Sequence, residues 1–566
     1  MMTDSSSAGP ALLLVDVLIS GGGPCGLMLA NELGRRGIRC LVVDAKPSTA
    51  FNPQANATQA RTMEHFRRLG FANEVRAQGL PPDHPTDIAY FTRYTQHELA
   101  RIRLPTAAEA TVKIQSMQGS WSAAELPHRV SQKLVEKTLR RHAQRWPSVD
   151  LRYGWTLEGF HDDGCDVHAT VRPTEGGPEQ KVKARYLVGA DGARSLVRRE
   201  LGIEWGGVTG IQREFMGGKM FAIYLRAPSF LTELGHPKAW MYVAVNHRRR
   251  AFMASVDGLA EYAFHAALKP GEDAEHWTED DARRVFTEAV GADVPIEILS
   301  MGTWLAGHAL VAKRFQHGRV FIAGDAAHLF TPTGGLGYNT AVEDAVNLAW
   351  KLASVLRGQA PEGLLDSYEF ERKRVAERNT GFARRFADSV GLFVAKPELE
   401  EQSALGEAER RLAAQHLDEH ARLEFNIPGV TFGGRYDGSP IIASDGAALP
   451  PDEPNAYVHT ASPGGRPPHA WLDDGRSLFD LFHDEWTLLA LGPDAPPTEG
   501  FETAARQTGT DLHVVRLPQA ALRELYEAPL ALIRPDQIVA WRGEADHEAL
   551  EVLSQVTGRA AARPST

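Results

Sequence analysis

The sequence predicts an α/β protein made of several structural units, and three observations point to that class. Its 566 residues are too many for one ordinary hydrophobic core. Residues 12–45 have the pattern of a buried strand, a Gly-rich turn, a helix and a second strand. Residues 221–225 and 240–245 instead alternate aromatic and aliphatic side chains, as antiparallel strands do, and strand-like runs return after residue 485.

The composition argues against several kinds of partner. Hydrophobic residues make up 43% of the chain and charged residues 23%, which is the balance of a soluble globular protein. A formal net charge of −11 argues against nucleic acid, because a protein that binds a phosphate backbone needs a concentrated positive face. A basic run at residues 248–250 is predicted to be a solvated hairpin turn.

The three cysteines, Cys25, Cys40 and Cys165, include no CxxC pair. A disulfide framework, a thiol redox motif and a metal site are therefore not expected. No Lys or Arg precedes the first apolar run, and Asp16 interrupts that run well before it could span a bilayer. We expect a cytoplasmic protein without membrane association.

A GxGxxG motif occupies residues 21–26, between the first strand and the first helix. Gly21 permits the tight turn, Gly23 lets a pyrophosphate approach the backbone, and Gly26 lets the helix pack against the strand. The helix N-terminus then favours anions, and Asp44 ends the second strand where an acid binds a ribose hydroxyl. This pattern predicts a Rossmann-like dinucleotide site; the alternative is a glycine-rich turn without a ligand. Cofactor contacts are expected at Gly21, Gly23, Pro24, Cys25, Gly26, Asp44 and Ala45.

Cys25 lies in the first turn of that helix, where a thiol pKa can be lowered. We expect a small residue packed beside the phosphates rather than a reactive thiol.

Two later strands also end in acidic residues. Residues 186–190 lead into Asp191, and residues 319–323 lead through a glycine into Asp325. A glycine-rich loop follows the second of these and opens a helix at Thr340. An acid at the carboxyl end of a strand can accept hydrogen bonds from sugar-alcohol hydroxyls, and the next helix N-terminus can accept negative charge.

These motifs, in this order and at these separations, resemble the group A flavoprotein monooxygenases, which are single-component FAD-dependent aromatic hydroxylases. The stretches GDAAHLFTPTGGLGYNTAVEDAVNLAWKL and DGARSLVR carry the resemblance, which covers residues 16 to about 390. It implies that Asp325 binds the flavin ribityl chain and that Asp191 helps to bind both FAD and the nicotinamide cofactor. It implies further FAD contacts at Arg61, Arg129, Gln132, Pro332, Gly335, Leu336, Gly337, Tyr338 and Asn339.

The resemblance implies hydroxylation of a phenolic aromatic ring with NADPH or NADH and O₂, through a hydroperoxide at flavin carbon 4a. Only one GxGxxG of this quality is evident, so the nicotinamide is expected to bind transiently to the surface of the FAD unit. Pro332 is expected to face the flavin. The substrate walls are expected among Trp240, Tyr242, Phe252 and Phe221, each of which fits ordinary sheet core equally well.

The chain departs from the family pattern near the expected substrate. Asn56 stands where phenol-hydroxylase relatives commonly have an aspartate that assists the substrate phenol, and Gln54 stands where the family often has a basic residue. Asn56 remains a catalytic candidate, but an amide cannot act as a base, so the group that deprotonates the substrate stays open. His328 belongs to the structural GDAAH signature and is not expected to be that base.

Other functions stay open at this point. One is an FAD-dependent reductase or oxidase of the same fold that does not hydroxylate. Another is a catalytically idle flavin-binding protein, against which the intact glycine loop at residues 334–337 argues. A flavin-dependent halogenase is disfavoured because the WxWxIP segment of that family is missing.

The expected organisation is a Rossmann-like FAD-binding domain with an inserted β-sheet substrate domain and a C-terminal thioredoxin-like α/β domain. The FAD-binding domain takes residues 1–90, 125–200 and 310–395, the substrate domain residues 91–124 and 201–309, a helical connector and linker residues 396–460, and the thioredoxin-like domain residues 461–566. The last domain resembles the tail of the phenol-hydroxylase branch but has no CxxC, so its role is expected to be structural.

Five large apolar residues of the tail are expected to pack against the flavin-binding unit or a second subunit: Trp471, Leu478, Phe479, Leu481 and Phe482. The alternative is that all five pack inside the tail itself. A homodimer stays open.

Overall fold

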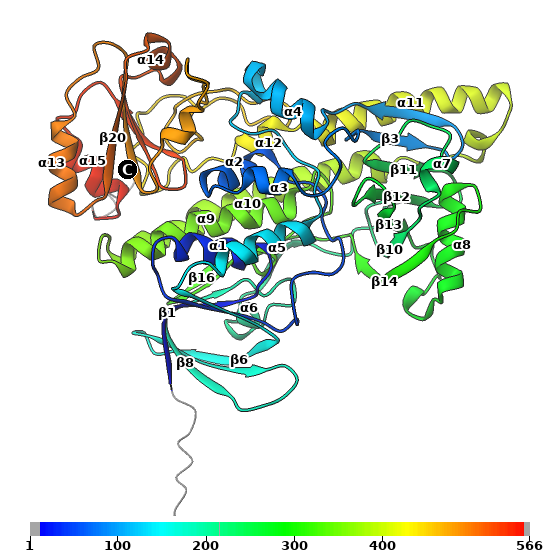
Figure 1. The fold of residues 1–566 in the computed structure, drawn as a ribbon, viewed down its shortest axis with the longest axis horizontal. Coiled ribbons are helices and arrows are strands. Elements are labelled where there is room, and N and C mark those ends of the chain that lie inside the picture. Colours follow the sequence, from blue (N-terminus) through cyan, green and yellow to red (C-terminus); the bar gives the residue numbers. More distant parts are fainter. Residues whose placement is uncertain (1–11, 214, 560–566) are drawn as a thin grey trace, which may run out of the picture.

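An eight-stranded, mostly parallel sheet forms the first unit (Figure 1). The computed structural model describes residues 12–213 and 215–559. The sheet has the order β16-β17-β8-β1-β2-β5, with β6 and β7 joined to β8 outside this path. Its strands are β1 (Leu13–Ser20), β2 (Cys40–Asp44), β5 (Val149–Tyr153), β6 (Trp155–Asp162), β7 (Val167–Pro173), β8 (Gln180–Gly189), β16 (Gln316–His317) and β17 (Val320–Ile322).

The parallel pairing places the acidic strand ends together. β1 pairs in parallel with β2 and β8, and β17 pairs in parallel with β8, so the carboxyl ends of all four strands meet at one edge. Helix α1 (Pro24–Gly34) leaves that edge and packs against α5 (Gln132–Ala143) and α9 (Leu336–Leu356). The predicted strand, turn, helix and strand of residues 12–45 are confirmed, with ends that differ by a few residues.

A seven-stranded sheet forms the second unit, in the order β14-β10-β13-β12-β11-β3-β4. Its strands are β3 (Ile88–Phe91), β4 (Glu98–Ile102), β10 (Lys219–Arg226), β11 (Met241–Val245), β12 (Arg250–Ser255), β13 (Glu261–Ala267) and β14 (Glu297–Leu305). Helix α8 (Glu279–Val290) packs on one face, here called the outer face. The opposite, inner face packs in part against α10 (Asp366–Gly391), α11 (Ala404–Phe425) and Ala57. The expected boundary at residue 90 falls inside β3.

The basic run forms a hairpin turn between β11 and β12, as predicted, but two of its arginines are not solvated. Arg249 is 3% exposed and forms ion pairs with Glu272 and Glu288, at 2.8 and 2.7 Å. Arg250 is 4% exposed and donates a hydrogen bond to the carbonyl of Phe393. The solvated interpretation is wrong because acids and carbonyls distant in sequence satisfy both guanidinium groups.

Helix α9 begins four residues before the predicted start, because Gly335 caps it in the left-handed region with φ of 65°. A small three-stranded sheet has the order β18-β15-β9. The shorter elements are α2 (Ala60–Arg68), α3 (Ala72–Arg76), α4 (Ala107–Lys113), α6 (Leu196–Glu200), α7 (Phe230–Glu233), α12 (Pro428–Phe432), β9 (Trp205–Val208), β15 (Ala309–Ala312) and β18 (His328–Leu329).

The C-terminal unit is a four-stranded sheet flanked by helices, in the thioredoxin-like order β20-β19-β21-β22. β19 pairs in parallel with β20 and antiparallel with β21, which pairs antiparallel with β22. The strand-like runs expected at residues 486–491, 530–533 and 538–541 coincide or overlap with β19, β21 and β22, whereas β20 was not predicted. Its elements are β19 (Trp486–Leu491), α13 (Glu499–Thr508), β20 (Leu512–Leu517), α14 (Ala520–Tyr526), β21 (Leu530–Ile533), β22 (Val539–Gly543) and α15 (Ala549–Val556).

This unit packs on the first unit, as expected, although most of the five named residues do not carry the contact. Trp486 meets Trp350 of α9 with ring centroids 5.7 Å apart. Trp471 donates its indole N–H to the carbonyl of Ile114. Leu478 instead packs in the unit's own core, as do Leu481 and Phe482. Phe479 lies against the guanidinium of Arg466, 4.8 Å from its ring centroid.

A buried ionic cluster fixes the same interface. Arg534 donates to both carboxylate oxygens of Glu371, at 2.7 and 2.9 Å, and also to Asp536. Lys351 of α9 donates to Glu371 at 2.7 Å. Burial lowers the pKa of Lys351 to about 8, although Glu371 opposes that shift. Such a cluster tolerates removal of one member poorly, because each remaining charge is cut off from water.

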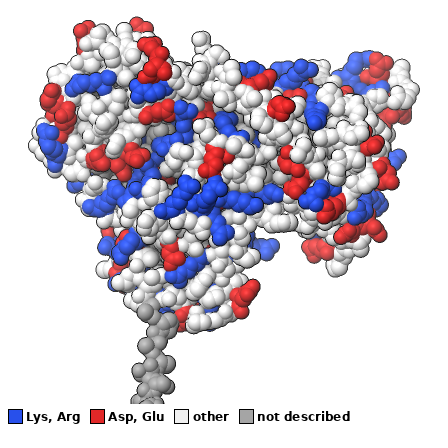
Figure 2. Space-filling view, in the orientation of Figure 1, with Lys and Arg blue, Asp and Glu red and all other residues white. Residues whose placement is uncertain are grey.

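Figure 2 shows Lys and Arg gathered in a band across the middle of one face, over the region of α1 and α5. Within residues 12–213 and 215–559, no helix has the length and apolar character needed to cross a bilayer. The same residues contain no group of three or more His, Cys, Asp or Glu placed to hold a metal ion.

Candidate active site

The glycine turn after β1 is shaped to admit a ligand at one position only. A Cβ on Gly21, which has φ of 114°, would collide with the carbonyl of Ala190, and a Cβ on Gly26 would collide with the carbonyl of Gly21. No atom lies within 4 Å of the place where a Cβ on Gly23 would be. Gly23 caps α1 without a side-chain hydrogen bond, which leaves N–H groups of the first turn for an anion.

Two acids at neighbouring strand ends face this turn. Asp44 accepts a hydrogen bond from the N–H of Gly22 at 2.7 Å, which ties the end of β2 to the glycine turn. Ala45 follows it and is exposed. Asp191 accepts from the N–H groups of Leu196 and Val197 through one oxygen. Its other oxygen is buried without a hydrogen-bond partner among the described residues, and burial raises the pKa of this carboxyl.

Asp325 follows β17 and presents a free carboxylate. It accepts no hydrogen bond from the described residues and is exposed. The surrounding protein desolvates this carboxyl and so raises its pKa, whereas the charges of His328 and Lys46 lower it. The adjacent Gly324 packs on Cys25, whose thiol has a strongly raised pKa because it is buried. Cys25 therefore has the character of a packing residue, as expected.

The glycine loop before α9 is bound to the segment of residues 54–59. Gln59 donates its backbone N–H to the Asn339 side chain at 2.9 Å and its side-chain amide to the carbonyl of Gly334 at 2.6 Å. Asn339 in turn donates to the carbonyls of Ala57 and Gly335. Gly335 and Gly337 are half-buried and Pro332 is exposed on this loop.

Two expected cofactor contacts on this loop direct their side chains elsewhere. Leu336 packs with Phe382 and Phe386 in a buried cluster. The hydroxyl of Tyr338 forms a buried hydrogen bond with Thr58 at 2.7 Å. Their backbone alone is available to a ligand, because both side chains complete the core under the loop.

The substrate candidate Asn56 lies in the segment that the glycine loop holds. Its Oδ1 is buried and accepts no hydrogen bond from the described residues, whereas Gln54 is exposed. Gln132, an expected FAD contact, instead donates its side-chain amide to Glu136 at 2.8 Å. Asn56 is thus an acceptor whose hydrogen-bonding capacity is not used within the protein.

Arg129 stacks on Trp240, with the guanidinium carbon 4.3 Å from the ring centroid. It donates no hydrogen bond to the described residues, and burial lowers its pKa to about 10. These free N–H groups suit a contact with FAD. Trp240 itself is 2% exposed beneath the guanidinium, so it does not form a substrate wall.

Arg61 differs most from its expected position. Its guanidinium donates to the carbonyls of Asp536 and Gln537 in the C-terminal unit and to Glu64. Glu64 also accepts from Arg466 through both carboxylate oxygens, at 3.0 and 2.5 Å. The assignment of Arg61 to the flavin is therefore corrected: its bonds join α2 to the C-terminal unit.

The two faces of the seven-stranded sheet differ in whether their aromatic side chains could contact a substrate. Tyr242 and Phe221 lie on the outer face, buried against the cluster that includes α8, so neither can contact a ligand beside the glycine loop. Phe252 lies on the inner face and is half-buried, as are His265 and Trp304. The sequence reasoning missed His265 and Trp304, although period-two alternation along their strands could have placed each of them on a face.

His328 is buried inside the first unit. Its Nε2 is 2.6 Å from Asp344, which also accepts from Arg372 and from the N–H of Gly324. Because the ring is 0% exposed, its contacts are structural and it cannot reach a substrate, as expected.

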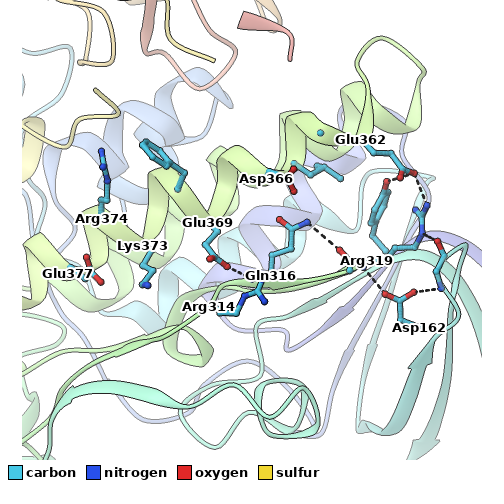
Figure 3. Close-up of a pocket in the computed structure, with 16 residues that line it drawn as sticks. Asp162, Arg314, Gln316, Arg319, Glu362, Asp366, Glu369, Lys373, Arg374 and Glu377 are labelled. Atoms are coloured by element: carbon cyan, nitrogen blue, oxygen red, sulfur yellow. Dashed lines mark hydrogen bonds and ion pairs between the residues drawn. The ribbon is translucent and has the colours of Figure 1, made fainter. Parts of the chain in front are cut away.

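A groove of about 880 Å³ lies between α10 and the β16–β17 hairpin, away from these residues (Figure 3). Charges of both signs line it, and Arg319 forms an ion pair with Glu362 at 2.7 Å. Arg319 precedes β17, whereas Asp325 follows its carboxyl end. Dinucleotides bind outside the carboxyl ends of parallel strands, so this groove is not the cofactor site.

The fold and the site together define a flavin-binding oxidoreductase. A family model for the FAD binding domain matches residues 14–383, and a model for the C-terminal region of aromatic-ring hydroxylases matches residues 460–564. The chain belongs to the family of FAD-dependent aromatic-ring hydroxylases and is a monooxygenase.

Individual relatives match along nearly the whole chain. Aklavinone 12-hydroxylase RdmE of Streptomyces purpurascens is 33% identical over 569 residues, which cover 96% of this chain and 98% of that protein. Phenol 2-monooxygenase of Pseudomonas sp. (strain EST1001) is 29% identical, in a match that covers 94% of this chain and 90% of that protein. The solved structure of the rebeccamycin biosynthetic enzyme RebC with reduced flavin has 33% identity and a TM-score of 0.86, over 97% of this chain and 100% of that one.

The described residues fit FAD. The open space at Gly23, beside N–H groups of the first turn of α1, suits a pyrophosphate. The unpartnered oxygen of Asp191 and the free carboxylate of Asp325 are acceptors for hydroxyl groups of the cofactor. At Gly21 and Gly26 the backbone lies too close to neighbouring carbonyls for any side chain, and this tight turn is the shape that pyrophosphate binding requires.

Proposed function

We propose that this monooxygenase hydroxylates a phenolic aromatic ring held between the inner face of the seven-stranded sheet and residues 54–59. The half-buried aromatic side chains of the inner face, Phe252, His265 and Trp304, carry this proposal. Ala57 of the segment packs on the same cluster and also lies next to Gly335, which links this face to the flavin loop. The named relatives phenol 2-monooxygenase and aklavinone 12-hydroxylase support the same class of reaction.

Residues of the glycine turn and the acidic strand ends would hold FAD: Gly21, Gly23, Gly26, Asp44, Asp191 and Asp325, with the backbone of residues 335–339 beside the flavin ring. When bound, FAD supplies the redox chemistry that activates oxygen. Arg129 provides free donors and directly follows His128, which pairs with Thr58 in the segment that carries Asn56.

Asn56 orients the substrate in this proposal. Its buried, unpartnered Oδ1 accepts a hydrogen bond from the phenol O–H, which directs the ring and polarises the bond to hydrogen. An amide does not take the proton, so the proton passes to solvent or to another group. The apolar walls exclude bulk water from the ring.

We propose NADPH or NADH as the reductant and O₂ as the second substrate. The nicotinamide cofactor is an anion, and the basic band over α1 and α5 (Figure 2) is the surface that would attract it. We further propose a cytoplasmic location and a homodimer, the latter checked by the mass of the purified protein in solution.

The test is a screen of substituted phenols for stimulated NAD(P)H oxidation by the FAD-loaded protein, with the products identified. A hydroxylated product formed in step with NAD(P)H consumption supports the proposal. NAD(P)H oxidation that yields only hydrogen peroxide, or a reduced product, supports the alternative of an oxidase or reductase. A protein that binds FAD but reacts with no reductant would be an idle flavin-binding protein.

A further inference from the structure

The inner face contains a row of side chains in which one imidazole lies next to small residues. Strand register aligns Val243, Phe252, His265, Ala222 and Gly302 across five neighbouring strands. On one side of His265, Ala222 and Gly302 are small, and no atom lies within 4 Å of the place where a Cβ on Gly302 would be. On the other side, Phe252 stacks on the imidazole with ring centroids 4.6 Å apart and planes inclined by 17°.

The tautomer of His265 is determined by its neighbour. The indole N–H of Trp304 donates to Nδ1 of His265 at 3.1 Å. An indole nitrogen can only donate, so Nδ1 keeps its lone pair and the proton of the neutral ring resides on Nε2. Burial lowers the pKa of His265 to about 4, which keeps the ring neutral at neutral pH.

Nε2 of His265 has no hydrogen-bond partner among the described residues, and the side chain is half-buried. It is therefore a neutral N–H donor with a fixed orientation at the edge of open space. No side chain of the aligned row carries a charge. Such a site suits an oxygen atom on a flat, uncharged ring system better than a carboxylate or an ammonium group.

We propose that His265 is a substrate-binding residue that donates its Nε2 hydrogen to an oxygen substituent of a fused aromatic ring system. The proposal rests on the proposed function and specifies its substrate class. Two steps between adjacent strands separate His265 from Gly302, a span of about 10 Å in which the row itself carries only the small residue Ala222. That span admits fused rings, and a single ring leaves part of it unfilled.

The test compares two probes of the same shape, 2-naphthol and naphthalene, with the FAD-loaded protein. Dissociation constants are measured from the change in the flavin absorption spectrum, which requires no turnover. The variant His265→Phe keeps an aromatic ring but loses the donor, and His265→Gln restores an N–H donor. Phe221→Leu, on the outer face, is the matched control.

We expect His265→Phe to weaken 2-naphthol binding about tenfold and to leave naphthalene within about threefold of the parent. His265→Gln should recover most of the lost affinity, and Phe221→Leu should change neither probe. The parent should bind 2-naphthol more tightly than phenol because its second ring can lie over Ala222 and Gly302.

The outcomes separate this inference from the proposed function. A parent protein that binds neither 2-naphthol nor any other phenol in the screen contradicts the proposed function itself. A parent that binds 2-naphthol while His265→Phe binds it equally well overturns the role of His265 alone. Equal loss of both probes in His265→Phe also overturns the hydrogen bond, because only packing would then be affected. Thermal unfolding of each variant verifies that the fold is retained.

Discussion

Replacement of Arg534 by Met should loosen the C-terminal unit from the flavin-binding unit. Arg534 is 1% exposed and shares four hydrogen bonds with Glu371 and Asp536, at 2.7 to 3.0 Å. Methionine fills much of the same volume but supplies neither charge nor donors. Glu371 would then depend on Lys351 for its charge compensation. Loss of one partner from a buried ion pair costs about 3–5 kcal/mol, and we expect a free energy of unfolding lower by that amount.

Arg523→Met is the matched control for this experiment. Arg523 pairs with Glu544 at 3.5 Å, and the side chains are 44% and 74% exposed. An exposed pair of this kind contributes less than about 1 kcal/mol. Urea unfolding at saturating FAD, followed by tryptophan fluorescence, reports on the interface because Trp350 and Trp486 meet there. If the two variants unfold at the same urea concentration with the same slope, the buried cluster does not hold the units together.

Four further predictions concern the cofactor, the substrate and pH. Asp325→Ala should weaken FAD binding by about 1.5–3 kcal/mol, or roughly ten- to over a hundredfold, in a fluorescence titration, and unchanged affinity would show that its carboxylate does not bind the ribityl chain. Gly23→Ala should fold normally, because its Cβ meets no atom within 4 Å, yet lose FAD affinity at least about tenfold; equal affinity would place the pyrophosphate elsewhere. Asn56→Asp should add an acidic limb to the pH–rate profile, with the rate falling as pH drops through the pKa of the new carboxylate, and an unaltered profile would separate this position from the phenol. The pKa of Lys351 is about 8 in the folded protein and about 10.4 in the unfolded chain, so the unfolded chain binds more protons between these two pH values. The free energy of unfolding should therefore rise with pH in that window, and Lys351→Met should remove this rise. An equal slope of unfolding free energy against pH in parent and variant would contradict the prediction.

The sequence was sufficient for features that depend on local order along the chain. The glycine turn, Asp44 and Asp325 could be placed because a strand, its end and the next helix follow one another within a few residues. The thioredoxin-like unit was predictable for the same reason, from strand-like runs and a resemblance in its tail.

Features that depend on partners far away in the chain could not be predicted in this way. Alternation places Phe221 and Tyr242 on a face of their strands but does not say which face packs on α8. Arg61 closely follows residues 54–59 in sequence, yet it donates hydrogen bonds to the carbonyls of residues 536 and 537. The donor role of His265 requires Trp304 on β14, the next strand along the chain, which β10 separates from β13 in the sheet.

The bonds between α2 and the C-terminal unit also bear on how such enzymes can be recombined. Gln537 and Arg466 bind Arg61 and Glu64, which directly follow the segment that carries Asn56. A tail transplanted from a relative would bring its own residues to these positions and so alter the support of the substrate segment. Successful chimaeras should therefore exchange residues 54–68 together with the tail, and natural lineages should inherit the two pieces as a matched pair.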